Sequence, residues 1–462
     1  MSPSNLRSYW DYTFLWTDLH QTKEQLRPRI YTYDRLADEC LERLDVLAPE
    51  TVQDVQNDAA GPKKPRRDMH ALMKDHARND PKLGELWTQV NTVPEWVDWQ
   101  QIQRGQDVFF RYGLPILNAL NFGSLLGGIS DYNIPRGSAR VVETLARTGG
   151  FSADVVRRRL LETLQFVLQV SESLDAIKPG GAGHVSSIRV RLLHASVRSR
   201  ILSLAKNDPD YYNVDECGVP INDLDCIATI NTFSSIVIWV GLPRQGIWLR
   251  KQEINDYLAL WRLVAYYMGT PDTPFASQPS GRAMMESLTA SEFNPTDVSK
   301  LLAHNIILGL EKTAPTYASK EFMEAMARYL NGRQLSDRLG IPQTNLYYRS
   351  LIYGYRFFVM TLAYGTRLFP TLDQTLIAFR RKLYYTMITD REKGLGGESF
   401  YAFQYVPSYG KTTSPGKRRS SKPAAVGIEA VAQLGLLAAL LAAVVVFSGG
   451  IYALRILTPA IL

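Results

Sequence analysis

The chain has 462 residues, a formal net charge of +7, 45% hydrophobic residues and 21% charged residues. This length suits two or three average domains or one large body with extensions, and the composition excludes an intrinsically disordered protein. The three cysteines are odd in number and lack the spacing of zinc ligands, so neither a disulfide framework nor a cysteine-rich metal site is expected. This cysteine usage fits a reducing compartment.

Residues 1–100 are predicted to form an N-terminal helical extension that includes a basic linker. A start rich in tryptophan and tyrosine precedes a helical pattern at 33–47, and residues 50–68 carry the proline, glycine and clustered basic residues typical of a linker. Such clusters lie in solvated linkers more often than in nucleic-acid sites, so no nucleic-acid partner is expected. The first thirty residues are charged throughout, which argues against a secretory signal.

Residues 101–390 are predicted to form one all-α body. Sustained period-two alternation bounded by hairpin turns is missing from the sequence, and glycine and proline separate the helical segments. The many segments around one plausible core favour a globin-like or related orthogonal packing over an up-and-down bundle. Apolar residues recur at spacings of three and four in 140–146, 153–170, 187–204, 223–240, 251–268, 298–308 and 346–369.

The C-terminal part is predicted to anchor the protein in a membrane. Residues 391–429 are polar and rich in glycine, serine and lysine, as expected of a flexible linker, and 430–454 are apolar over a length that spans a bilayer. A buried core helix is the alternative. Because a cationic stretch at 411–422 precedes the apolar run, we expect a single-pass C-terminal anchor with the body in the cytosol, at the endoplasmic reticulum if the source is eukaryotic.

One histidine stands among arginines in the segment Arg189-Val-Arg-Leu-Leu-His-Ala-Ser-Val-Arg. On a helix, Arg191, His194 and Arg198 share one face, and the remaining positions of that turn are apolar. A neutral imidazole between two guanidinium groups suits an iron porphyrin, with the imidazole on the metal and the arginines on the propionates. A core histidine or a surface histidine remains an alternative for His194.

The order of Glu143, Arg159 and Thr163 before the Arg-Leu-Leu-His-Ala segment resembles the latex-clearing protein (rubber oxygenase) family and its relatives, the endoplasmic-reticulum-bound MpaB-type oxygenases of fungi. The resemblance covers roughly residues 105 to 310. It implies that His194 is the proximal ligand of haem b and that the three upstream residues line the distal side. It further implies a haem-dependent oxygenase that uses O₂ on an apolar, isoprenoid or prenylated substrate, with oxidative cleavage of a C=C bond as the family reaction.

One residue departs from the family pattern. Rubber oxygenases carry a lysine just before the distal threonine that can occupy the sixth iron position, and here that residue is Glu162. A lysine-gated resting state is therefore not expected, and rubber itself becomes a weaker prediction for the substrate.

Two further histidines are not expected to bind a metal. His184, in a glycine-rich stretch, is expected to face solvent, and His304 is expected in the core.

A non-catalytic helical membrane-associated protein that has lost the haem chemistry is the alternative to the oxygenase. A non-haem metal or flavin enzyme is disfavoured, because neither a two-histidine-one-carboxylate spacing nor a dinucleotide fingerprint is present.

Overall fold

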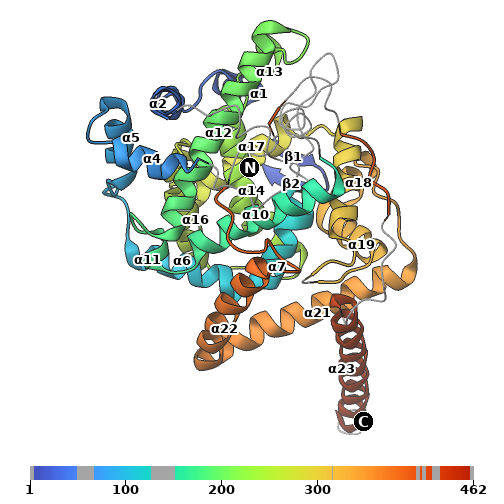
Figure 1. Cartoon of the computed structure of the whole chain (residues 1–462). Helices are drawn as coiled ribbons and strands as arrows, with labels where there is room; N and C mark the ends of the chain where they lie inside the picture. Colours follow the sequence, from blue (N-terminus) through green and yellow to red (C-terminus); the bar gives the residue numbers. More distant parts are fainter. Residues whose placement is uncertain are drawn as a thin grey trace.

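The computed structural model describes residues 5–48, 67–125, 151–314, 316–401, 406–407, 413–418 and 427–457. Within them the body is built almost entirely of helices, as the periodicity predicted, and one long helix, α23 (Ile428–Leu457), projects from it (Figure 1). The N-terminal part contains β1 (Leu6–Tyr9), β2 (Tyr12–Leu15), α1 (Lys23–Leu26), a 3-10 turn (Arg27–Ile30), α2 (Arg35–Leu47), α4 (Met69–His76) and α5 (Pro81–Asn91).

The helices of the body follow. Its first half contains α6 (Trp99–Arg111), α7 (Gly113–Asn118), a π-helical turn (Ala119–Leu125), α10 (Ala153–Ser171), α11 (Leu174–Ile177), α12 (Ala182–Asn207), α13 (Val214–Cys217) and α14 (Asp223–Phe233). Its second half contains a π-helical turn (Val237–Gly241), α15 (Leu242–Arg244), α16 (Lys251–Tyr267), a 3-10 turn (Thr273–Phe275), α17 (Gln278–Ser291), α18 (Asp297–Leu310), α19 (Lys320–Asn331), α20 (Arg333–Arg338), α21 (Leu346–Leu368) and α22 (Pro370–Thr389).

A short antiparallel hairpin, β1–β2, was not predicted. Leu6 pairs with Leu15 and Tyr9 with Tyr12, and the turn residues Trp10 and Asp11 both have positive φ angles, 54° and 59°. Two residues with positive φ are typical of the hairpin turn whose twist matches that of the strands. Four residues per strand are too few for alternation to be detected in the sequence.

The main core is centred on α16. Trp261 is fully buried and stacks on Phe233 of α14, with the ring centroids 4.9 Å apart. A second, smaller cluster joins the N-terminal helices to α12: Cys40, Met73 and Leu86 pack with Leu192 of α12, and all four are fully buried. The N-terminal extension therefore covers one side of α12.

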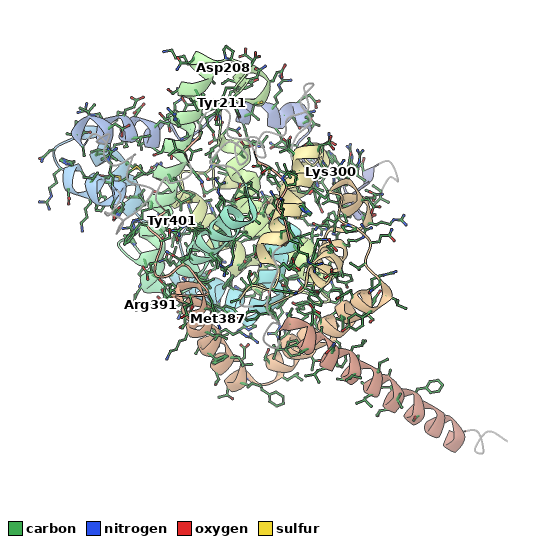
Figure 2. All side chains as sticks on the ribbon, turned by 45° about the vertical axis from the view of Figure 1, so that its right-hand side comes forward. Asp208, Tyr211, Lys300, Met387, Arg391 and Tyr401 are labelled. Carbon is green, nitrogen blue, oxygen red and sulfur yellow. The ribbon has the colours of Figure 1, made fainter. Side chains whose placement is uncertain are left out.

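The segment after α22, predicted as a flexible linker, makes specific contacts wherever the structure describes it. Ser399 exchanges hydrogen bonds with Gln165 of α10, at 2.7 and 2.9 Å, and the Tyr401 hydroxyl donates to Gln169 at 3.0 Å. Figure 2 labels Met387, Arg391 and Tyr401 along this flank of the body. Farther on, the amide of Gly416 donates to Asn305 at 2.7 Å. The described parts of this segment therefore pack against the body, while the predicted domain boundaries stay predictions.

Two helical stretches are long and apolar enough to cross a membrane. The stretch 223–244 is half buried inside the body (50%), as expected of a core segment, whereas only 11% of 428–449 is buried. The second stretch is a candidate membrane anchor and agrees with the apolar run predicted from the sequence.

Candidate functional site

The candidate site is built on α12, the longest helix of the body, which carries Arg191, His194 and Arg198. Gly181 precedes the helix as its N-cap, and Ser187 donates to the carbonyl of Gly183 at 2.8 Å inside the first turns. The helix runs without interruption to Asn207. The predicted helical spacing of the three side chains therefore holds.

His194 is a neutral imidazole. Burial, and to a smaller extent the charge of Arg198, lower the pKa of His194 to about 4, although Asp34 acts in the opposite direction. No hydrogen bond to either ring nitrogen is found among the described residues. At neutral pH the ring therefore carries a nitrogen lone pair that is available to a metal.

Both arginines are held by aspartates near the start of α2. Arg191 binds Asp34 through two bonds, Nε–Oδ2 at 2.5 Å and Nη2–Oδ1 at 2.9 Å, and Nη2 also donates to Gln89 at 2.9 Å. Arg198 also forms a bidentate ion pair, with Asp38, in which Nε lies 2.9 Å from Oδ2. Only 2% of each arginine side chain is exposed, so these are buried ion pairs.

The two guanidinium groups differ in what they leave unpaired. Arg198 donates from all three nitrogens, including a bond of 2.8 Å from Nη1 to the carbonyl of Ile221. Nη1 of Arg191 is buried and has no partner among the described residues. A buried donor without an acceptor is costly, so Arg191 retains a place for one more acceptor oxygen.

Gly269 closes the Arg191 site from the other side. Its φ angle is +68°, and a Cβ atom there would lie 2.5 Å from Asp34 Oδ2 and 2.6 Å from Arg191 Nε. Both the backbone conformation and the lack of space call for glycine. The loop after α16 thus fits directly against the ion pair.

Helix α10 carries the predicted distal residues Arg159 and Thr163. It packs against α12 near the end that leads to α11, where Ser186 of α12 donates to Gln169 of α10 at 2.6 Å. Thr163 is exposed, and the guanidinium of Arg159 lies 5.7 Å from the centre of the Phe151 ring.

The remaining predicted residues are accounted for as follows. Glu143 lies outside the described residues. Glu162, which replaces the family lysine, accepts a hydrogen bond from Ser399 Oγ at 2.9 Å and pairs with Arg158 at 3.3 Å. Its carboxylate therefore helps to fix the segment that follows α22.

The predictions for the other two histidines were wrong. His184 belongs to the first turn of α12 and is 1% exposed; its Nδ1 accepts from the amide of Gly180 and its Nε2 contacts the carbonyl of Val90 at 2.8 Å. His304 is exposed on α18. The first error arises because α12 begins earlier than the local sequence indicated, so that it includes His184. The second arises because the face of α18 that carries His304 is turned toward solvent.

Comparison with known proteins gives the family. Residues 117–363 match the sequence profile described as "ER-bound oxygenase mpaB/B'/Rubber oxygenase, catalytic domain", which is more than half of the chain. The chain belongs to this oxygenase family. The resemblance deduced from the residues around His194 is thereby confirmed, with boundaries shifted toward the C-terminus.

Two curated relatives and one solved structure are similar to this family member. The rubber oxygenase of Streptomyces sp. (strain K30) is 23% identical over 285 residues, which is 60% of this chain and 66% of the relative, slightly under two thirds of that protein. Aurantioclavine synthase cnsA of Penicillium expansum is 58% identical over 33 residues, 7% of each chain. The structure of latex clearing protein in the closed state has a TM-score of 0.54 and 21% identity, covering 83% of this chain and 95% of the other. That likeness supports the helical fold.

Sequence analysis missed Asp34 and Asp38, the partners of both arginines. Asp34 has a recognisable local role, because it is the N-cap of α2 and accepts from the amide of Ala37. That cap signal could have placed both carboxylates at the start of a helix, four residues apart and on one face. The sequence contains no signal that pairs them with α12.

Proposed function

We propose that this family member is a haem b-dependent oxygenase, held at a membrane by α23, that uses O₂ on an apolar, isoprenoid-bearing substrate. Oxidative cleavage of a C=C bond into two carbonyl fragments is the reaction proposed. The observation that supports it most is the neutral, unpartnered imidazole of His194 on a helix inside the family-matched region.

The donor set around His194 fits haem b. The chain offers one neutral nitrogen for the iron and, at Arg191, a buried Nη1 that has no acceptor among the described residues and could bind a propionate oxygen. When bound, haem b would supply the redox chemistry with dioxygen. Arg198 is proposed as a second propionate-side charge, although its nitrogens already serve Asp38 and the carbonyl of Ile221.

The distal residues have separate proposed roles. Arg159 would donate hydrogen bonds to polarised oxygen atoms, and the hydroxyl of Thr163 would orient oxygen or water. Glu143 would hold or move a proton, because burial of a carboxyl group in an apolar pocket raises its pKa toward neutrality. All three roles are proposed on the family pattern, and those of Arg159 and Thr163 also on the contact of α10 with α12.

The membrane assignment rests on α23. Its apolar stretch is long enough to span a bilayer and is little buried by the body. We infer that it anchors the chain with the body in the cytosol, at the endoplasmic reticulum in a eukaryotic host. An anchored active site would meet substrates dissolved in lipid.

The ion pairs of Arg191 and Arg198 favour a second candidate function. Both arginines are satisfied mainly by Asp34 and Asp38. A helical membrane-associated protein that has lost haem chemistry would keep these pairs for stability alone.

One experiment separates the two candidates. The full chain, purified in detergent after expression with a haem supply, is expected to show a Soret band and a b-type pyridine haemochrome. His194→Ala should lose most of the haem, while His304→Ala, at an exposed histidine of α18, should retain it. A folded but colourless wild-type chain would favour the non-catalytic candidate. Product masses under ¹⁸O₂ then test C=C cleavage, which places one labelled oxygen in each fragment when both atoms come from O₂.

A further inference from the structure

Helix α22 carries an apolar stripe on its solvent side. Leu372, Leu376, Phe379 and Leu383 follow one another at spacings of four, three and four residues and therefore lie on one face. Phe379 is 59% exposed and Leu372 is 47% exposed. A surface helix normally turns its apolar face toward the core.

Two charged groups on the inner face of α22 bind α6. Asp373 accepts three hydrogen bonds from Arg111 of α6, the shortest 2.7 Å, and Arg380 donates to the carbonyls of Phe110 and Arg111 at 3.0 and 2.6 Å. Asp373 and Arg380 are both buried, and so are Ile377 and Ile388 on the same inner face. Helix α22 therefore has apolar side chains on both faces, so its outer face is suited to contact something other than water.

The turn between α21 and α22 extends this apolar surface. Leu368 is 75% exposed and Phe369 is 60% exposed. Trp248, 58% exposed, is tied to the same turn, because Arg367 donates to its carbonyl at 2.9 Å and its amide donates to the Tyr364 hydroxyl at 3.2 Å. We call the set Trp248, Leu368, Phe369, Leu372, Phe379 and Leu383 the apolar corner.

The apolar corner lies on the side of the body from which α23 leaves. In Figures 1 and 2 the turn between α21 and α22 lies at the lower edge of the body, toward which α23 also projects, and α21 runs between the turn and α23. The two parts are joined through α21: a Cβ atom at Gly354 would lie 2.1 Å from the carbonyl oxygen of Ala432, and one at Gly435 would lie 2.3 Å from that of Gly354. Backbones this close fix α23 against α21, and so fix its position relative to the corner.

Basic side chains border the apolar corner. Arg250 and Lys251 follow Trp248 closely in sequence, and Lys382 stands next to Leu383; all three are exposed. Apolar and aromatic side chains flanked by lysine and arginine are the composition of surfaces that enter the interface of a bilayer containing anionic lipids. Tryptophan in particular favours the headgroup level.

We propose that the apolar corner inserts into the headgroup–acyl boundary of the bilayer that α23 enters, so that the protein contacts the membrane at two places. The proposal rests on the anchoring role of α23 in the proposed function. Two contacts, separated along α21, hold the body in one orientation on the lipid surface, whereas a single helix would leave it free to tilt. The alternative is that the apolar corner binds the same surface of a second copy of the chain. Lipid is favoured because basic side chains border the corner and because α23 leaves the body on the same side.

The test places an environment-sensitive fluorophore on single introduced cysteines of the full chain in vesicles of phosphatidylcholine with some phosphatidylserine. Phe369→Cys and Phe379→Cys report on the corner, Val445→Cys reports on α23, and Lys206→Cys is the control. Lys206 is exposed close to Asp208, which Figure 2 labels at the opposite end of the body. The wild-type chain, labelled in parallel, corrects for the partly buried Cys226.

Lipids that carry a nitroxide group should quench most of the fluorescence of probes at positions 369, 379 and 445 and leave the fluorescence of the probe at 206 unchanged. Quenching at 445 but not at 369 and 379 would overturn the proposal and leave the anchor in place. No quenching at any position would overturn both. Shielding of 369 and 379 from a water-soluble quencher without quenching by lipid would assign the corner to a second copy of the chain instead.

Discussion

The carboxylate of Asp34 has two roles, because it caps α2 and forms a buried two-pronged ion pair with Arg191, 157 residues later in the chain. Arg191 lies three residues before His194 on the same face of α12. The N-terminal helices precede the family-matched region 117–363. They nevertheless supply the partners of the charged residues on either side of the proposed iron ligand.

Removing the charge of Asp34 should destabilise the protein strongly. Asp34→Asn keeps an oxygen for the helix cap but leaves Arg191, 2% exposed, without its counter-charge, and such a loss costs about 3–5 kcal/mol in the free energy of unfolding. Chemical denaturation followed by circular dichroism measures this. Lys300→Ala is the control, because it removes an exposed pair with Asp297 worth about 0–1 kcal/mol. Equal losses in the two variants would contradict a stabilising role for the Asp34–Arg191 pair.

Gly269→Ala should cost more than Gly180→Ala. Both glycines have positive φ angles, +68° and +88°, so each alanine pays roughly 1–2 kcal/mol for the left-handed backbone. At Gly269 the new methyl group also collides with Asp34 and Arg191, whereas no described atom lies within 4 Å of the corresponding position at Gly180. The difference between the two losses in unfolding free energy gives the cost of the steric collision at Gly269. A difference of zero would mean that the loop after α16 does not pack tightly against the ion pair.

Local periodicity was enough to predict most of the body. The segments 153–170, 251–268 and 346–369 correspond within a few residues to α10, α16 and α21, because long amphipathic helices repeat their pattern many times. The hairpin β1–β2 was missed because each strand has four residues. Helix α22 was not predicted as a separate element, because its buried face mixes charged and apolar residues and its exposed face is also apolar.

The candidate site could be predicted only where it is local. The helical spacing of Arg191, His194 and Arg198 follows from the sequence, and the structure keeps it. Their partners Asp34 and Asp38 are 157 and 160 residues away, and Ser399, the partner of Glu162, is 237 residues away. Pairings over such separations depend on how helices pack, which composition and periodicity in one sequence do not encode.

The stability of the haem-free chain should fall between pH 6.5 and pH 4 because of His194. Its pKa is about 4 in the folded chain and 6.5 as a free side chain, so unfolding takes up a proton in this range. The stabilisation by the neutral ring is complete above pH 6.5 and is lost as the pH falls toward 4, at about 1.4 kcal/mol per pH unit within the window.

Denaturant titrations at several pH values test this. His194→Phe should flatten the pH dependence by up to that slope, and Ser196→Ala, two residues along the same helix, should leave it as in the wild type. A slope identical in wild type and His194→Phe would mean that the ring has the same pKa in the folded and in the unfolded chain. Such a ring would not be removed from water, so that outcome would weaken the proposed place of His194 in a buried haem site.

The crossing of α21 and α23 should break when Gly354 gains a side chain. Gly354→Leu forces a leucine into backbone atoms of Ala432 and Leu436. Gly365→Leu on the same helix places its Cβ more than 4 Å from every described neighbouring atom and raises helix propensity equally. The reporter is a short thiol cross-linker between Tyr347→Cys and Gln433→Cys, whose native side chains share a hydrogen bond of 2.6 Å. Cross-linking in vesicles should be retained with Gly365→Leu and largely lost with Gly354→Leu. Retention in both would mean that α23 is held by other contacts. If α23 does separate, the lipid contact of Phe369 should weaken while that of Val445 persists, because the crossing is what holds the apolar corner at the depth set by the anchor.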